Sequence, residues 1–289
     1  MISVTPVRLG FVAMFAAGAM VAAHNAAEAQ GPGASVNLAP HIAIYDLKLT
    51  SSRGKRSLES VRGRIVYDFS GSACDGYALN FRQVTELDSG EGKVALSDLR
   101  TSTWEEGEGK SFRFTSENYM DDQKISQVDG QADRAKSDVA VKLNKPESKN
   151  FDAGVVVFPT EHMRLLIEAA HAGKSLLEVA VYDGSEQGEK IYQSLSVIGR
   201  RIEPDRKPED AAADKDALAG LARWPVTISY FDKVAKISDD QPGEQTPIYA
   251  ISFEMYENGI SRALRLDYGD FVIDGKMSSL EVKPVKACK

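Results

Sequence analysis

The two cysteines of the chain are the residues whose chemistry the sequence constrains most. Cys74 lies in the stretch SGSACDGYALNFR and Cys288 is the next-to-last residue, so each has only the other as an internal partner. No Lys, Arg or His stands in the ACDGY context, and such a neighbour is what lowers the pKa of a reactive thiol. We therefore expect a structural disulfide rather than a redox switch. A bridge across 214 positions would stabilise the fold by roughly 5 kcal/mol if loop entropy alone is counted.

Glu161 and His162 are the nearest approach to a catalytic pair. A histidine beside a carboxylate could act as a general base in a hydrolase. Residues adjacent in sequence, however, point in different directions from a helix, and the sequence places no serine or cysteine nucleophile near them. We therefore favour local hydrogen bonding at the start of a helix for both residues, and we predict no catalytic residue.

A cluster of acidic residues offers a third kind of chemistry. Glu105, Glu106 and Glu108 lack the alternating oxygen-ligand spacing of a calcium loop, so we expect them at the solvated tip of a hairpin. The sequence also lacks the C-x-x-C, H-E-x-x-H, G-x-S-x-G and G-x-x-x-x-G-K motifs. We expect neither a metal ion nor another cofactor.

Residues 1–29 have the features of a secretory signal peptide. Arg8 supplies the positive charge, residues 9–23 form an uncharged, largely apolar run, and the AEA sequence at 27–29 is a cleavage site. This run is shorter than the about 20 residues that a helix needs to span a bilayer. We therefore expect cleavage after Ala29, export to the periplasm and no membrane-spanning segment. That compartment is oxidising, which favours the disulfide.

The remaining residues, 30–289, carry an all-β pattern. From Ala39 onward apolar and polar residues alternate with period two, and clusters of Gly, Asp, Asn or Ser interrupt the alternation. We count about fourteen antiparallel strands and expect a curled, incompletely closed, barrel-like sheet. We expect a single domain, with a candidate boundary between two halves in the loop 203–221. This loop is charged and Ala-rich, so we expect a mobile excursion.

Two details of the pattern predict local structure. In the first strand, HIAIYDLKLT, the apolar residues change phase between Ile44 and Tyr45, which predicts a bulge or a passage between sheet regions. Turns with positive φ are predicted at Asp183-Gly184, Asn258-Gly259, Gly269-Asp270 and Asp274-Gly275.

One amphipathic helix, at about 160–172, interrupts the strands. Thr160 is its candidate N-cap and Gly173 can end it. The helix either covers an open face of the sheet or plugs the mouth of an incomplete barrel, and in the second case its apolar stripe would line a cleft for an apolar ligand. The stripe consists of Met163, Leu166, Ile167 and Ala170.

The order of these features resembles one known family. The signal peptide, CDGYALNFR, STWEEGEGKSFRF, GVVVFPTEHM and the terminal cysteine together are similar to the EipB-like periplasmic envelope-integrity proteins of alphaproteobacteria. The resemblance covers nearly all of residues 30–289. It implies a β-spiral of about fourteen strands, a disulfide between Cys74 and Cys288, and a shape like that of periplasmic lipoprotein carriers. It brings no catalytic residues.

Together these observations predict a soluble, non-enzymatic periplasmic protein that maintains the cell envelope, including under envelope stress. We expect it to bind an apolar ligand, which is a lipid or a lipoprotein acyl chain, or another envelope protein. The net charge of −7 argues against a nucleic-acid partner. A periplasmic hydrolase of envelope polymer and an interaction scaffold without a ligand remain the alternatives.

Overall fold

The fold is taken from a computed structural model that describes residues 36–53, 58–90, 92, 94–232 and 246–284. These described residues belong to one compact unit. The predicted signal peptide and Cys288 lie outside the described residues.

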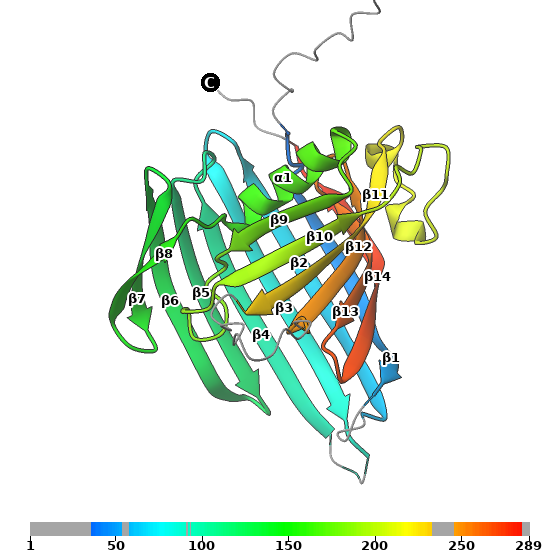
Figure 1. The fold of residues 1–289 in the computed structure, drawn as a ribbon. Coiled ribbons are helices and arrows are strands. Elements are labelled where there is room, and N and C mark those ends of the chain that lie inside the picture. The colour runs from blue at the N-terminus through cyan, green and yellow to red at the C-terminus, as the bar shows by residue number, and fades with distance from the viewer. Residues whose placement is uncertain (1–35, 54–57, 91, 93, 233–245, 285–289) are drawn as a thin grey trace, which may run out of the picture. The chain divides into compact units, whose positions relative to one another are not determined.

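Fourteen strands and one α-helix account for most of the described chain (Figure 1). The first eight strands are β1 His41–Ser52, β2 Ser60–Ser72, β3 Gly76–Asp88, β4 Val94–Glu105, β5 Ser111–Met120, β6 Gln123–Ala135, β7 Asp138–Lys145 and β8 Lys149–Gly154. After helix α1, Pro159–His171, follow β9 Leu176–Val181, β10 Tyr192–Ile198, β11 Arg223–Asp232, β12 Tyr249–Tyr256, β13 Ser261–Asp267 and β14 Phe271–Val282.

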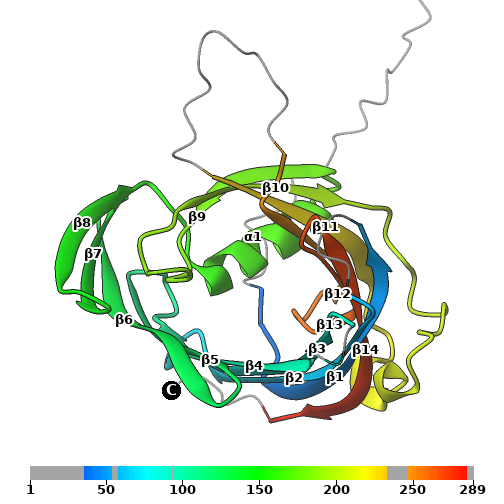
Figure 2. The same cartoon turned by 90° about the horizontal axis from the view of Figure 1, so that it is seen from below.

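All fourteen strands belong to one antiparallel sheet with the order β8-β7-β6-β5-β4-β3-β2-β1-β14-β13-β12-β11-β10-β9. Each strand pairs with its sequence neighbours, except that β1 pairs with β14 and that β8 and β9 are the two edges. The sheet curls around α1 (Figure 2), and a parallel bridge between Val157 and Val181 links its two edge regions. This arrangement confirms the predicted all-β, incompletely closed sheet with one helix.

Alternation of side chains explains which face of the sheet is buried. In β7, Val139, Val141 and Leu143 are buried while the residues between them are exposed. β1 follows the same rule, because His41, Ala43, Tyr45 and Leu47 are all buried.

The sequence predicts a bulge or a passage between sheet regions in β1, and the pairing of β1 with β14 does have a bulge at this place. The register shift lies between Ile44 and Tyr45, and these residues pair with Ser279 and Met277, so the extra residue is Ser278 of β14. The apolar Ile44 lies on the less buried face, so the buried face of β1 continues through the register shift without a change of phase.

Three of the four predicted turn sites have a glycine with positive φ: Gly184, Gly259 and Gly269. The fourth prediction is wrong, because Asp274 and Gly275 lie inside β14. A Cβ atom at Gly275 would come within 3.1 Å of Leu264 and 3.2 Å of Leu47. This glycine therefore permits close packing between strands rather than a turn.

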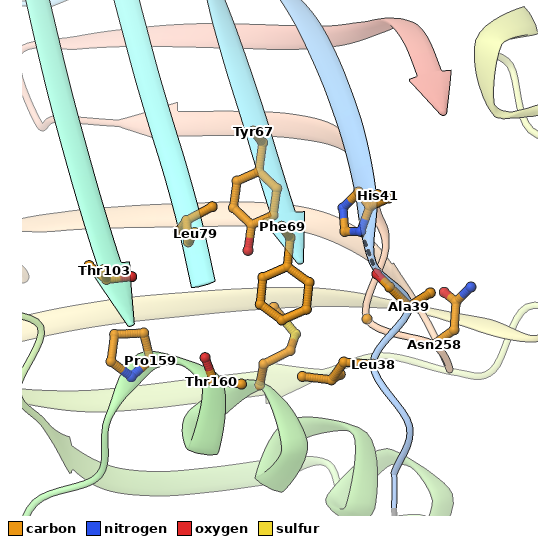
Figure 3. A pocket seen from close by; sticks show the side chains of 12 residues that line it. Leu38, Ala39, His41, Tyr67, Phe69, Leu79, Thr103, Pro159, Thr160 and Asn258 are labelled. Atoms are coloured by element: carbon orange, nitrogen blue, oxygen red, sulfur yellow. Dashed lines mark hydrogen bonds between the residues drawn. The ribbon is translucent and has the colours of Figure 1, made fainter. Parts of the chain in front are cut away.

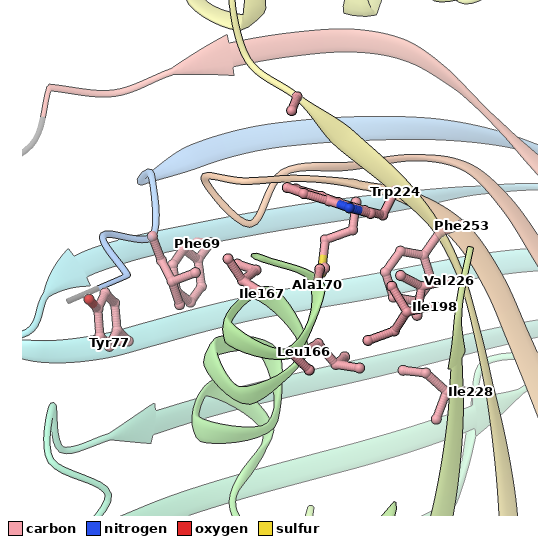
Figure 4. Packing of buried hydrophobic residues seen from close by; sticks show 14 residues of the cluster. Phe69, Tyr77, Leu166, Ile167, Ala170, Ile198, Trp224, Val226, Ile228 and Phe253 are labelled. Atoms are coloured by element: carbon pink, nitrogen blue, oxygen red, sulfur yellow. The ribbon is translucent and has the colours of Figure 1, made fainter. Parts of the chain in front are cut away.

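Helix α1 begins one residue earlier than the sequence predicts. Its N-cap is Phe158 rather than Thr160, Pro159 occupies the first turn, and the helix ends at His171. Proline suits this place because its missing N–H would have no helical partner there. Leu166, Ile167 and Ala170 pack into a buried cluster with residues of β2, β10, β11 and β12, such as Phe69 (Figure 4).

The segment 203–221 lies against the sheet. Ala213 and Leu218, in two short 3₁₀ turns, are buried in a second cluster with side chains of β1, β2, β13 and β14. Asp210 accepts a hydrogen bond from Arg262 Nε at 3.2 Å in the buried interior. No division of the compact unit falls in this segment, although the sequence suggests a boundary and a mobile excursion there.

Candidate ligand-binding cavity

A cavity of about 510 Å³ lies inside the curl of the sheet. Inward side chains of β1 to β4 form one wall, and those of β10, β12 and β13 form the other. The walls are mainly aromatic and aliphatic, with Phe81, Ile251, Phe253 and Leu264 among the lining residues. Cavities of about 300–1,000 Å³ with apolar walls are typical of small-ligand sites.

Two tyrosines that line this cavity, Tyr45 and Tyr192, have hydroxyls that bond to other protein atoms. Tyr45 Oη donates to the Ser261 carbonyl oxygen at 2.6 Å. Tyr192 Oη lies 3.0 Å from Ser185 Oγ. Because these hydroxyls are bonded to protein atoms, the cavity wall is more apolar than its residue types alone suggest. Such a wall suits an apolar ligand.

One end of the cavity carries exposed apolar residues. Ile248 and Tyr268 line the cavity and are each 40% exposed. Glu186, which is also exposed, is the one carboxylate among the described lining residues. These residues form a rim at which a partly apolar ligand can reach solvent.

Helix α1 lies at the opposite end. Of the four residues predicted to line a cleft, Met163 lines the cavity. Leu166, Ile167 and Ala170 instead pack in the core cluster shown in Figure 4. The helix thus combines the two predicted roles, because one of its side chains faces the cavity and three cover the core.

Glu105 fixes the start of α1. Its Oε2 accepts the Thr160 backbone N–H at 2.7 Å and its Oε1 accepts the Glu161 backbone N–H at 2.8 Å. Both N–H groups are in the first turn, where a helix offers no partner of its own. Burial raises the pKa of the Glu105 carboxyl to about 7, although these hydrogen bonds work to lower it.

The prediction of a solvated position is wrong for Glu105, which is 2% exposed. Glu106 and Glu108 do lie in the turn after β4, where Glu106 accepts the Glu108 backbone N–H and Glu108 pairs with Lys110. The sequence does indicate an inward position for Glu105, because alternation with period two from Leu99 and Thr103 places this residue on the inner face of β4.

Arg134 of β6 forms a second contact with the start of the helix. Its Nη2 donates to Glu161 Oε2 at 2.6 Å and its Nη1 donates to the Val156 carbonyl oxygen at 3.0 Å. The guanidinium also lies over the Phe158 ring, 5.1 Å from the centroid. Residues remote in sequence therefore hold the end of α1 that borders the cavity.

The structure does not assemble the candidate catalytic pair. Glu161 is engaged by Arg134, while His162 is 4% exposed and its Nε2 has no hydrogen-bond partner. Burial lowers the pKa of His162 to about 4. Neither residue lines the cavity. No group of three or more potential metal ligands occurs in the described part of the chain.

Cys74 lies in the turn between β2 and β3, where the Asp75 backbone N–H donates to Ser72 Oγ at 3.2 Å. The disulfide to Cys288 stays a prediction, because Cys288 is outside the described residues.

The open sheet, helix α1 and the internal cavity define a barrel-like all-β protein. A family model described as EipB-like matches residues 32–284. The cell envelope integrity protein EipB of Brucella abortus (strain 2308) is 37% identical over 256 residues, which cover 89% of this chain and 88% of that protein. The chain belongs to the EipB-like family.

A solved structure agrees with this assignment. The crystal structure of a beta-barrel-like protein of a domain of unknown function from Brucella abortus matches with a TM-score of 0.78 at 36% identity. The match covers 86% of this chain and 100% of that one. Among the residues described here, no helix has the length and apolar character needed to cross a membrane.

Proposed function

We propose that this protein maintains the integrity of the cell envelope as a non-enzymatic periplasmic protein, and that it binds the apolar chain of a lipid or lipoprotein in the cavity. The proposal of an apolar ligand rests on the cavity of about 510 Å³ with apolar walls. The name of the Brucella relative supports the envelope role. The signal peptide expected from residues 1–29 supports export to the periplasm.

The energetics favour a chain over a compact polar ligand. Each buried methylene contributes about 0.8 kcal/mol, so a chain of some ten methylenes would contribute roughly 8 kcal/mol before the cost of ordering it. The rings of Tyr45 and Tyr192 add contact area without free hydroxyls. An extended chain also suits a space bounded by strands.

The direct test is binding of the neutral dye phenylnaphthylamine, whose fluorescence rises in an apolar site, followed by its displacement with monolauroylglycerol. Leu99→Trp and Ile251→Trp should each weaken dye binding by about tenfold or more, since both add bulk to the cavity wall. Leu176→Trp is the matched control, because Leu176 is 59% exposed on edge strand β9.

Circular dichroism and thermal melting should first confirm that all three variants fold. Dye binding that is absent from the wild type, or unchanged in both cavity variants, would contradict the proposal. A wild type that binds neither dye nor lipid would favour the scaffold without a ligand. In a deletion strain, Leu176→Trp should restore envelope integrity and the cavity variants should not.

A further inference from the structure

A second, smaller cavity of about 50 Å³ lies between the large one and the start of α1. The two cavities share four lining residues, namely His41, Tyr67, Met163 and Gly259. These shared residues make the small cavity a continuation of the large one toward the start of α1. Figure 3 shows the residues that line the small cavity, with α1 beside them.

The strands give the direction from one cavity to the other. On paired strands β3 and β4, Leu79 and Thr103 are register partners and line the small cavity. Gln83 and Leu99 are partners four residues further along and line the large one. At about 3.3 Å per residue, the two levels are roughly 13 Å apart. The path from rim to helix therefore runs along the strands.

The wall becomes more polar toward the helix. Figure 3 shows the hydroxyls of Tyr67, Thr103 and Thr160 directed into the small cavity from β2, β4 and α1. His41 stacks on Tyr67 with ring centroids 5.5 Å apart. Its Nδ1 lies 2.7 Å from the Ala39 carbonyl oxygen, so Nδ1–H is the donor and Nε2 of the neutral ring is an acceptor.

No Lys, Arg, Asp or Glu is among the described residues that line the small cavity. Glu105 lies just behind its wall, where it accepts the backbone N–H of Thr160, a lining residue. A ligand carboxylate or phosphate here would be desolvated without a cation and would face this carboxyl group. A ligand ammonium would find no carboxylate on the described wall itself, and both oxygens of Glu105 already accept backbone N–H groups of α1. Burying an unpaired charge is costly, whereas an uncharged polar group can exchange hydrogen bonds with the hydroxyls of Tyr67 and Thr103. The Thr160 hydroxyl is already hydrogen-bonded to Glu105.

We infer that the small cavity binds the uncharged polar end of a single-chain ligand, a hydroxyl, ester or amide, while the apolar chain extends through the large cavity toward the rim at Ile248 and Tyr268. This inference rests on the proposed function, since it specifies the ligand and its orientation in the same site. The ligand class is a neutral single-chain amphiphile.

Three probes with the same chain test the inference: monolauroylglycerol, laurate and dodecylamine, each displacing phenylnaphthylamine from the full chain at neutral pH. Monolauroylglycerol should displace the dye at a roughly tenfold lower concentration than either charged probe. Tyr67→Phe and Thr103→Val, which keep shape and remove a hydroxyl, should each reduce that advantage. Tyr268→Phe, at the rim, is the matched control and should preserve it.

The outcomes separate the two proposals. If all three probes displace the dye equally, or if Tyr67→Phe and Thr103→Val leave the preference unchanged, the inference is overturned while the apolar site stands. A stronger effect of laurate would also overturn it. If the dye does not bind or no probe displaces it, the proposed function itself fails.

Discussion

At the scale of single residues, burial without a hydrogen-bond partner sets the behaviour of His162. The side chain is 4% exposed, Nε2 has no partner, and burial lowers its pKa from 6.5 to about 4. Between these two values the unfolded chain binds a proton that the folded protein does not. The histidine therefore reduces the free energy of unfolding as the pH falls from about 6.5 toward 4.

His162→Leu should remove this pH dependence. Between pH 7 and pH 5 the variant should lose roughly 2 kcal/mol less of its unfolding free energy than the wild type does. It also removes a buried nitrogen that has no partner, so we expect no loss of stability at neutral pH. Urea denaturation at the two pH values measures both effects.

The matched control is His171→Leu, because His171 is on the same helix but half its side chain is exposed. This variant measures the effect of replacing a histidine of α1 with leucine at a more exposed position. Equal pH dependence in His162→Leu and wild type would show that His162 is not the titrating group. His41, whose pKa burial also lowers, is present in all three proteins.

At the scale of elements, the position of α1 depends on a carboxylate from another strand. Glu105→Ala should leave the backbone N–H groups of Thr160 and Glu161 without their acceptor in a buried place. We expect a loss of about 1–3 kcal/mol in unfolding free energy, measured by urea denaturation, and faster hydrogen exchange of these two amides.

Two control variants define this effect. Glu105→Gln keeps one acceptor oxygen and should lose less than Glu105→Ala. Glu106→Ala removes a carboxylate whose contacts are in the exposed turn, so its stability should change little. Equal stability of Glu105→Ala and Glu106→Ala would mean that the buried carboxylate does not hold the helix.

The elements themselves could be predicted from the sequence, because strand alternation and the helical stripe are local patterns. What each side chain contacts could not. The sequence motif that contains Glu105 reads as a hairpin tip until its parity with Leu99 is counted. Asp274-Gly275 has the composition of a turn, yet contact with Leu47 and Leu264 decides its role. The acceptor at the start of α1 is 55 positions away in the chain, and no local pattern reports such a pairing.

At the scale of the molecule, β1 joins β2 to the last strand, β14. His41 of β1 pairs with Phe69 of β2 on one side and with Val282 of β14 on the other. Beyond β14, Lys283 reaches across β1 to form an ion pair with Asp68 of β2. We call the pairing of β2, β1 and β14 the seam of the sheet. Strands on both sides of this seam line the cavity, so the stability of the seam also affects the cavity.

The predicted disulfide would strengthen the same seam. Cys74 follows the end of β2, at the same end of the sheet as Val282, the last residue of β14. Cys288 is six residues beyond Val282 in the sequence. A bridge would therefore tie the end of β14 to the turn after β2. Restricting so long a loop in the unfolded chain makes the expected gain about 2–5 kcal/mol.

Cys288→Ser should accordingly lower the melting temperature under oxidising conditions and abolish the mobility difference between reduced and non-reduced gels. Cys74→Ser should behave identically, and the double variant should be no less stable than either single one, because all three lose the same bond. Adding a reductant should bring the wild type to the level of the variants. If wild type and Cys288→Ser melt together without reductant, the two cysteines do not form a stabilising bridge, and the hydrogen bonds and ion pair between β14, β1 and β2 alone hold the seam.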